Sequence, residues 1–563
     1  MKNGCLIVGL LSLFPFLTVA QEPDGFDAES IHIDDNVGEQ MMSVPSHGAD
    51  DAFLRRYGRY SNNDADLLLN TVTSSIKRSL KAYMNGTASL GKGDNAPFWF
   101  TSGRQGLSPV ETGSLLLDLG FDGGMRLPNG FSFNYGMNVA VGDGCQSDFR
   151  LQQMYVEAGY RWFDLSVGSR CRWGELKNPA LSSGALTWSG NCRPVPQIRF
   201  EVPDFVPLGF LDDWVSLKGH LSYGWFQDGK WRKDASARVS SSHSYVDNIL
   251  YHSKSLFLRL GGGTRFPLEV IWGLEMYGQF GGTAHNMFVS SLGQYVEEYS
   301  FPSNLPAYAE ILLPFNVIGK QGNENGNSLG SWHLSFGFKK ERWKYRLYYE
   351  HFYEDHSSML GIEYKPDVSG ARGFVFYGMK YNWFDGLFGF EVNAPDELPV
   401  RNFVIEFLNT KGQCGSVCNF SHCVPEGVDG RDAMYNHGVY GSFSSWGYSV
   451  GSPVLVSPLY NKDGDIRFKS NRTMALHCGM DGTFADRFDW RVMLTCSSHW
   501  GTYADPFTER ENVFSSLFEC LYRFGGASSW KTGVSVAVDS DSGALLGNNW
   551  GIMLTVSKLW KLL

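Results

Sequence analysis

The feature that most constrains the fold is a run of strict alternation near the start of the chain. From Phe131 to Val141, every odd position is apolar and every even position is small or polar. A period of two places the apolar side chains on one face of a β-strand. A strand of this length, tilted by about 45° and rising about 3.3 Å per residue, crosses the roughly 25 Å apolar band of an outer membrane. The pattern therefore predicts a membrane-spanning strand with odd positions toward lipid and even positions toward a lumen.

A second alternating run, residues 114–121, precedes this strand and predicts its hairpin partner. Between the two runs lies Leu127-Pro128-Asn129-Gly130, where proline presets φ and glycine accepts a positive φ. Strands of soluble sandwiches also alternate, but they usually span about five or six residues. We therefore expect residues 114–141 to form one hairpin of a membrane barrel.

The composition favours one large closed β-domain over residues 81–563. Glycine contributes 65 of 563 residues, above its usual share of about 7%, and aromatic residues reach 15%. Both suit the bends and interfacial girdles of a barrel. After the N-terminus no stretch offers the roughly 18 apolar residues of a membrane helix, which excludes a helical inner-membrane protein. A net charge of −10 without a basic run argues against a nucleic-acid partner.

The first 80 residues have a different character. Lys2, an apolar stretch over residues 6–19 and small residues around Ala20 predict a signal peptide over residues 1–20, cleaved near Ala20. Residues 21–80 are then a polar, acidic lead-in on the periplasmic side. Within it, apolar residues recur every four positions over residues 64–80, which predicts a short helix beneath or inside the barrel.

Runs of strand character with turn residues between them continue to the end of the chain. They predict strands at residues 152–167, 214–225, 255–260, 268–280, 332–338, 343–352, 374–381, 403–408, 472–479, 490–496, 514–524, 531–538 and 550–556. Longer irregular stretches predict extracellular loops or lumen inserts at residues 180–206, 314–331, 412–432 and 441–465. Aromatic clusters near strand ends, such as residues 160–163, favour a membrane-interface belt over sugar stacking.

Removal of the signal peptide leaves nine cysteines, so at least one is unpaired or pairs between chains. Cys414, Cys418 and Cys423, with His422, could hold zinc in principle. Their spacing matches no common zinc-finger pattern, so a loop with an optional disulfide is the preferred interpretation. We expect no metal and no cofactor.

The sequence resembles the Wzi family of capsule-assembly proteins over nearly all of the chain after residue 80. The segments that carry the resemblance are residues 95–100 with Arg104, 181–199, 351–359, 435–438, 451–453, 457–461, 471–472 and 500–503. The resemblance implies an outer-membrane β-barrel of about eighteen strands with helical elements attached. It also implies that the protein binds capsular polysaccharide at the surface of a Gram-negative cell and helps to assemble the capsule there.

Two features depart from this pattern. Outer-membrane barrels commonly close on a terminal Phe or Trp, whereas this chain ends Leu559-Trp560-Lys561-Leu562-Leu563, with Lys558 interrupting the apolar face. Trp560 is near enough to the end to serve. Cys192, Cys414 and Cys418 also fall inside stretches that are expected to lack cysteine.

The pattern at Glu354-Asp355-His356-Ser357 contains an acid, a base and a nucleophile. Neighbouring strand residues point to opposite faces, so these residues cannot form a triad by themselves. The chain also lacks a phosphate-loop motif and a nucleophile elbow, which favours a protein that is not an enzyme.

A polysaccharide site needs aromatic platforms, amide or carboxylate groups and a few arginines. The candidate ligand-binding residues are Trp188, Asn191, Arg193, Glu354, Asp355, His356, Tyr435, Asn436 and His437. The leading hypothesis is a lectin-like barrel whose partners are capsular polysaccharide, outer-membrane lipid and the barrel-assembly machinery, and which acts as a monomer. The alternatives are a porin or channel and, less favoured, an outer-membrane hydrolase.

Overall fold

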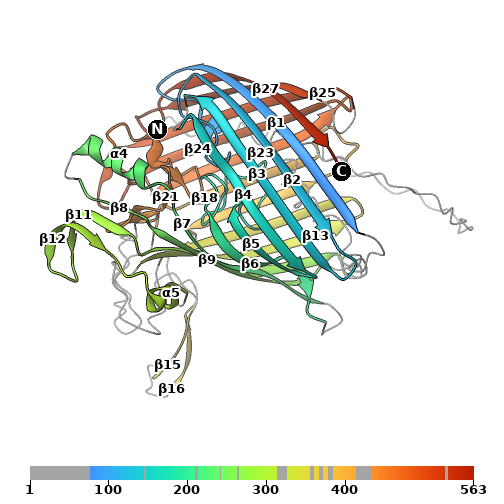
Figure 1. Cartoon of the computed structure of the whole chain (residues 1–563). Coiled ribbons are helices and arrows are strands. Elements are labelled where there is room, and N and C mark those ends of the chain that lie inside the picture. The colour runs from blue at the N-terminus through green and yellow to red at the C-terminus, as the bar shows by residue number, and fades with distance from the viewer. Residues whose placement is uncertain are drawn as a thin grey trace, which may run out of the picture. The chain divides into compact units, whose positions relative to one another are not determined.

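Antiparallel strands form a continuous closed ring (Figure 1). The structure is a computed structural model, and it describes residues 76–144, 147–209, 214–240, 243–262, 266–312, 326–354, 361–366, 372–377, 384–413, 433–525 and 530–563. Eighteen strands pair with their neighbours in chain order. They are β1 (Lys77–Lys92), β2 (Ser114–Arg126), β3 (Phe131–Asp143), β4 (Phe149–Tyr160), β5 (Phe163–Ser169), β6 (Gln197–Pro207), β7 (Val215–Trp225), β9 (Leu250–Gly261), β10 (Leu268–Phe280), β13 (Asn327–Lys340), β14 (Trp343–Tyr353), β17 (Gly386–Asn393), β18 (Asn402–Asn409), β23 (Thr473–Phe484), β24 (Phe488–Gly501), β25 (Pro506–Arg523), β26 (Lys531–Asp541) and β27 (Asn549–Lys561).

The ring closes because β1 pairs with both β2 and β27. In the second pairing Lys92 lies opposite Trp550 and Ala82 opposite Trp560, so the aromatic residue near the chain end is part of the seam. Closure satisfies the backbone groups of both terminal strands, which an open edge would leave unpaired. The expected closed barrel of about eighteen strands is confirmed.

The predicted hairpin is confirmed in both its pairing and its faces. Phe121 pairs with Met137 and Leu117 with Val141. The Met137 side chain is 36% exposed on the outside, whereas Asn138 is 3% exposed and faces the lumen. At the turn, Leu127 N donates to Phe131 O at 2.8 Å, and Gly130 adopts the positive φ of 88° that favours glycine.

The same alternation runs around the ring and makes the barrel apolar outside and polar inside. On β27 the outward residues Trp550, Ile552, Leu554 and Val556 are exposed, while the residues between them are buried. A barrel that spans a lipid bilayer requires this arrangement, with apolar side chains on its outer surface and polar side chains in its interior. No helix among the described residues is both long and apolar enough to cross a membrane.

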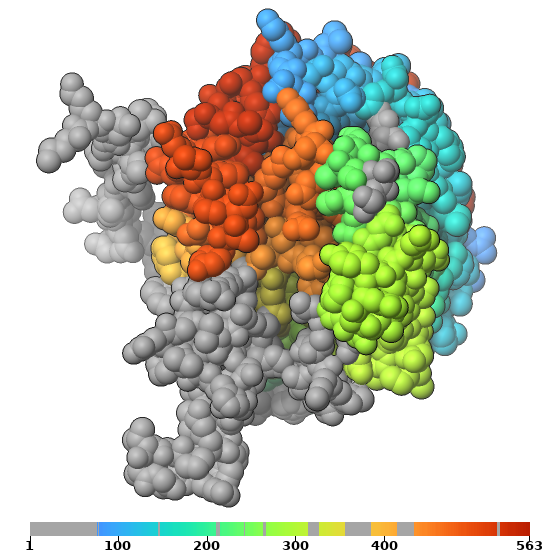
Figure 2. Space-filling view, turned by 90° about the vertical axis from the view of Figure 1, so that its left-hand side faces the viewer, coloured from blue at the N-terminus to red at the C-terminus, as the bar shows by residue number. Residues whose placement is uncertain are grey.

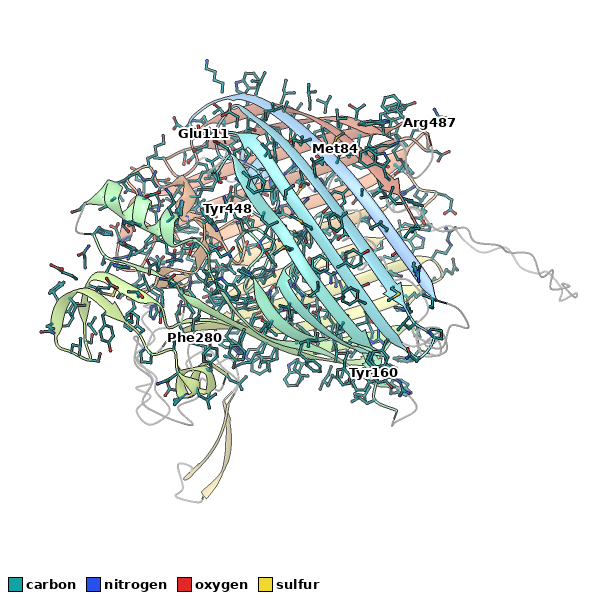
Figure 3. The ribbon with its side chains drawn as sticks, viewed as in Figure 1. Met84, Glu111, Tyr160, Phe280, Tyr448 and Arg487 are labelled. Carbon is teal, nitrogen blue, oxygen red and sulfur yellow. The ribbon has the colours of Figure 1, made fainter. Side chains whose placement is uncertain are left out.

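The two ends of the barrel differ in their connections. At one end, called here the short-turn end, β4 and β5 are joined by two residues and β13 and β14 likewise. At the other, the long-loop end, the connections are long and include α4 (Gly229–Val239) and the sheet of β8 (Tyr245–Asp247), β11 (Thr283–Val289) and β12 (Gln294–Ser300). Tyr160 and Arg487 lie at the short-turn end, and Glu111 and Tyr448 toward the long-loop end (Figure 3). In outer-membrane barrels the longer loops face the cell exterior.

Several sequence-based boundaries are wrong. The predicted helix over residues 64–80 cannot include residues 77–80, because they open β1; residues 64–75 lie outside the described part of the chain. Barrel closure needs β1 as a partner for β27, and this requirement outweighs the helical spacing. Residues 327–331, expected to be irregular, belong to β13, whose Asn327 lies opposite Gln279 of β10. β17 has no counterpart among the predicted strands.

Two further corrections concern whole strands. β6 lies within and just beyond the stretch 180–206 that was predicted to be irregular. The strand was not predicted because prolines argue against one. Pro203 lies where the register with β7 shifts between Val202 and Val206, and such a bulge tolerates proline. The run 374–381 was predicted to be a barrel strand, but β16 (Arg372–Tyr377) pairs with β15 (Gly361–Pro366) in a separate hairpin. Residues 378–381 lie outside the described part.

Candidate functional site

Two chain segments pack together inside the barrel, residues 170–196 and residues 433–472, which together are called here the lumen insert. The second segment includes β19 (Asn436–His437), β20 (Gly441–Ser442), β21 (Ser444–Ser445), β22 (Tyr448–Ser449) and the short helix η4 (Pro458–Tyr460). One buried cluster joins both segments to the inward face of the wall and includes Trp188, Tyr435, Phe443, Tyr251 and Tyr277. Seen from the long-loop end, the second segment, in orange, occupies the centre of the molecule (Figure 2).

Hydrogen bonds tie the two segments of the insert to each other. Ser189 donates from N to Val450 O at 3.0 Å and from Oγ to Gly451 O at 2.6 Å. Ser452 Oγ donates to Ser183 O at 3.1 Å, and Tyr435 Oη donates to Leu186 O. Segments about 250 residues apart in the sequence thus form one packed body.

Buried carboxylates on the wall hold the first segment of the insert. Glu406 of β18 accepts from Ser183 N and Ser183 Oγ, both at 2.6 Å, and from Ser182 Oγ at 2.7 Å. Glu350 of β14 accepts from Leu186 N at 2.8 Å and pairs with Lys177 Nζ at 2.9 Å. Because these carboxylates are buried, their bonds are protected from water, and losing one partner would leave the other group unsatisfied.

Three of the predicted ligand-binding residues lie in the first segment. Trp188 is buried, stacks on Tyr277 with ring centroids 5.8 Å apart, and donates from Nε1 to Arg172 O at 3.0 Å. Asn191 is buried and donates from Nδ2 to Ser449 O at 3.2 Å. The Arg193 guanidinium lies 3.9 Å from the ring centroid of Trp446, a cation–π contact.

Tyr435, Asn436 and His437 lie in the second segment. The peptide N–H of Tyr435 donates to Glu354 Oε1 at 2.8 Å, so Glu354 is brought to the same place. Asn436 Nδ2 donates to Phe468 O at 2.9 Å, and its Oδ1 accepts from Phe468 N at 2.8 Å. His437 Nδ1 faces Val439 N at 3.2 Å, and burial lowers the pKa of its ring to about 4.

The structure therefore brings the seven described candidates together around the insert, while Asp355 and His356 lie outside the described residues. Most of their polar atoms bond within the chain, so their contribution here is to build the insert. Their contact with a ligand stays a prediction.

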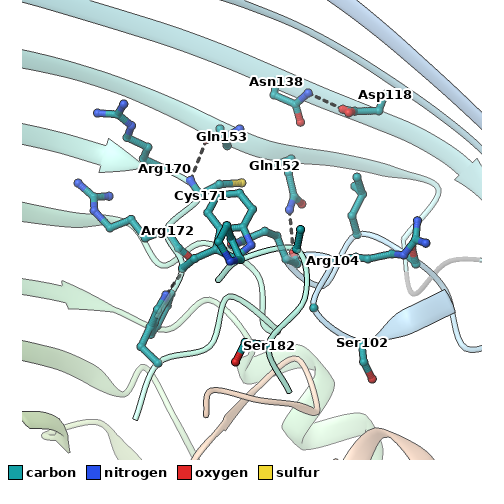
Figure 4. A pocket seen from close by; sticks show the side chains of 18 of the residues that line it. Ser102, Arg104, Asp118, Asn138, Gln152, Gln153, Arg170, Cys171, Arg172 and Ser182 are labelled. Carbon is teal, nitrogen blue, oxygen red and sulfur yellow. Dashed lines mark hydrogen bonds between the residues drawn. The ribbon is translucent and has the colours of Figure 1, made fainter. Parts of the chain in front are cut away.

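Sequence reasoning missed a cavity of about 220 Å³ between the insert, the loop that follows β1 and the inner wall (Figure 4). Its lining includes Tyr83 and Asn85 of β1, Asp118 of β2, Gln152 of β4 and Arg172 of the insert. The sequence signal for this cavity is the presence of polar residues at the inward positions of β1 to β4. Alternation predicts that each faces the lumen, but it does not predict which of them meet.

Several charged groups around this cavity form ion pairs. Arg199 Nε lies 2.7 Å from Glu201 Oε2, and Arg491 Nη2 lies 3.1 Å from Glu519 Oε1. Arg172 pairs with Glu201 at 3.6 Å, and desolvation by burial lowers the pKa of its guanidinium to about 10, so it remains charged at neutral pH.

Three inward carboxylates, on Glu157, Asp164 and Glu201, come within 4.8 Å of one another near the cavity. Arg170 pairs with Glu157, and Arg199 pairs with Glu201. The guanidinium groups neutralise the charge that would attract a cation, so we assign no metal to this cluster.

Comparison with known proteins gives structural neighbours without a family assignment. No protein-family model matches the sequence, and no curated protein matches it. One solved structure that is similar is Wzi, an outer-membrane protein involved in group 1 capsule assembly in Escherichia coli and a carbohydrate-binding β-barrel. It is 13% identical with a TM-score of 0.49, and the match covers 84% of this chain and 83% of that one. OccK5 (OpdH) of Pseudomonas aeruginosa is 9% identical with a TM-score of 0.41, covering 86% of this chain and 99% of that one. OccAB2 of Acinetobacter baumannii is 9% identical with a TM-score of 0.42, covering 86% and 98%.

Proposed function

We propose that this barrel is a non-enzymatic outer-membrane protein that binds capsular polysaccharide and helps to attach the capsule to the cell surface. One observation carries the proposal: separate segments that resemble the Wzi family in sequence meet in the structure. Residues of the segments 181–199, 435–438 and 451–453 bond to one another in the lumen insert. Tyr460, from the segment 457–461, lies in one buried cluster with Phe98 and Trp99 of the segment 95–100.

The chemistry near the long-loop end also suits a polysaccharide. The stacked Arg193 and Trp446 offer an aromatic face with a cation above it. Trp231 of α4 lies against Gly447, where a Cβ would come within 2.4 Å of the indole ring, so the chain next to Trp446 requires glycine. Aromatic faces combined with arginine suit the apolar ring faces and carboxylates of surface polysaccharides.

The direct test compares cell-bound with shed capsular polysaccharide in a strain of the host that lacks the protein. If the barrel attaches the capsule, total polymer stays constant and moves into the medium, and the intact gene on a plasmid restores attachment. Loss of all polymer would instead indicate a role in synthesis or export. No change in either pool would contradict the proposal and favour the porin hypothesis.

A binding measurement with the purified barrel in detergent provides the second test. We expect saturable binding of the host's capsular polysaccharide, with the polymer recovered at its original chain length because no hydrolysis takes place. Absence of binding would remove the basis of the proposal. Shortened polymer would revive the hydrolase hypothesis.

A further inference from the structure

Two glutamines that line the lumen cavity have side-chain oxygens whose positions are fixed by the hydrogen bonds of their amide nitrogens. Gln105 donates from Nε2 to Arg172 O at 2.8 Å, and Gln152 donates from Nε2 to Gln105 O at 2.7 Å. In each amide the nitrogen is committed to a carbonyl, so the oxygen must be the free atom. Neither Oε1 has a hydrogen-bond partner among the described residues, although both side chains are more than nine-tenths buried.

Further open acceptors line the same cavity. Asp118 accepts from Asn138 Nδ2 through Oδ1, which leaves its Oδ2 without a partner in the described part of the chain. Asn85 Oδ1 and Gln197 Oε1 are also buried, and neither has a hydrogen-bond partner among the described residues. Five side chains of this one lining therefore carry a buried acceptor without a partner among the described residues, and a ligand that satisfies these acceptors must bring several hydrogen-bond donors.

The charges of the lining indicate that such a ligand is neutral. The six basic residues are Arg104, Arg170, Arg172, Arg199, Lys218 and Arg491. The six acidic residues are Asp118, Asp122, Glu175, Glu201, Asp204 and Glu519. Several of them are already paired, as in Arg199 with Glu201 and Arg491 with Glu519. A lining with equal numbers of basic and acidic side chains, several of them paired, offers little net attraction to an anion or a cation.

We propose that this cavity binds a neutral, hydroxyl-rich saccharide, and that it is a second subsite for the polysaccharide. The inference rests on the proposed function, because that function supplies the saccharide. Sugar hydroxyls donate to the open amide and carboxylate oxygens, while the rings of Tyr83 and Trp173, which also line the cavity, offer apolar faces for stacking. The volume far exceeds the roughly 10–15 Å³ that one water requires.

The experiment uses the full barrel in detergent and short oligosaccharides released by mild acid from the host's surface polysaccharide. Anion exchange separates them into a neutral and an acidic fraction, and calorimetry measures the binding of each. We expect the neutral fraction to bind more tightly. Asn85→Leu, which removes one open acceptor and breaks no hydrogen bond found in the structure, should weaken that binding by about threefold to tenfold.

A second variant and a control distinguish loss of the binding site from loss of the fold. Thr87→Phe fills part of the cavity from β1 and should abolish binding of the neutral fraction. Ser335→Ala is the matched control, because this buried hydroxyl of β13 is also open but does not line the cavity. Resistance of each folded barrel to denaturation by detergent on heating shows that the variants have folded.

The outcomes separate the two proposals. If the barrel binds whole polysaccharide but the neutral fraction binds equally to the wild type, Asn85→Leu and Thr87→Phe, the cavity proposal is overturned and the proposed function stands. Tighter binding of the acidic fraction would also overturn it. If neither polymer nor fragments bind, both proposals fail and the cavity is a water-filled part of the lumen.

Discussion

Met137 and Asn138 are neighbours on β3 that face different solvents, lipid and lumen. A charge facing lipid at mid-bilayer costs roughly 2–4 kcal/mol, whereas a charge facing the lumen costs little. We therefore expect Met137→Arg to impair folding into bilayers. Asn138→Arg is the matched control, because its guanidinium would lie beside the Asp118 carboxylate. The measurement is the fraction of folded barrel after refolding into vesicles; equal losses for both variants would contradict the assigned faces.

His437 predicts a specific pH dependence of the lumen insert. Burial lowers the pKa of its ring from 6.5 to about 4, so the folded protein binds fewer protons than the unfolded chain between these values. The stabilisation by neutral His437 is then complete above about pH 6.5 and is lost as the pH falls toward 4. This stabilisation is at most about 3 kcal/mol, because water reaches part of the ring and reduces the cost of its charge.

The test is His437→Asn, which keeps an acceptor for Val439 N and Tyr440 N but does not titrate. We expect the susceptibility of the insert to limited proteolysis to rise between pH 6.5 and 4 in the wild type and to rise less in the variant. Parallel pH profiles would mean that other groups control the acid sensitivity.

At the scale of the element, the sequence predicted most strands in which alternation is long and uninterrupted, but neither β1 nor β17. The hairpin of β2 and β3 is the clearest case, since its lipid-facing residues alternate without a break. β6 shows the limit. Ile198 and Phe200 face outward and Arg199 and Glu201 inward, a regular alternation, but two prolines follow. A bulge is a property of two paired strands, so the residues of one strand do not reveal it.

The insert should depend on its anchors in the wall. Glu406→Leu removes the acceptor of Ser182 Oγ, Ser183 N and Ser183 Oγ, and leaves the two Ser183 donors buried without a partner. Each unsatisfied group costs about 1–3 kcal/mol. We expect a destabilisation of several kcal/mol, seen as a lower thermal unfolding midpoint and faster proteolysis within residues 170–196.

Glu397→Ala is the control for a carboxylate whose ion pair is exposed. Glu397 pairs with Arg342 at 2.7 Å on the surface, where solvent screens the attraction and such pairs contribute little to stability. Its unfolding midpoint should therefore stay close to that of the wild type. If Glu406→Leu behaves like Glu397→Ala, the carboxylates of the wall do not hold the insert.

At the scale of the molecule, the barrel was predictable and the interior was not. The alternation of apolar and polar residues along each strand shows which side chains face lipid and which face the lumen. That information is enough to predict a closed barrel. The pairing of Ser189 with Gly451, or of Gln105 with Gln152 beside the cavity, depends on contacts between distant segments. No local period encodes such contacts, and the candidate residues were instead chosen for their chemistry and for a family resemblance.

The filled lumen makes a prediction about the whole barrel. Barrels of 16–18 strands are wide enough to leave an aqueous channel unless something fills them. Here Phe443, Val450 and Leu455 of the insert are fully buried against the wall. We expect the reconstituted wild type to show no stable conductance steps in planar bilayers. Replacing residues 441–465 with a short Gly/Ser linker should produce such steps, because the ring of strands closes through β1 and β27 without them. Stable steps in the wild type would show that the insert leaves an open path, and the channel hypothesis would then replace the polysaccharide-binding one.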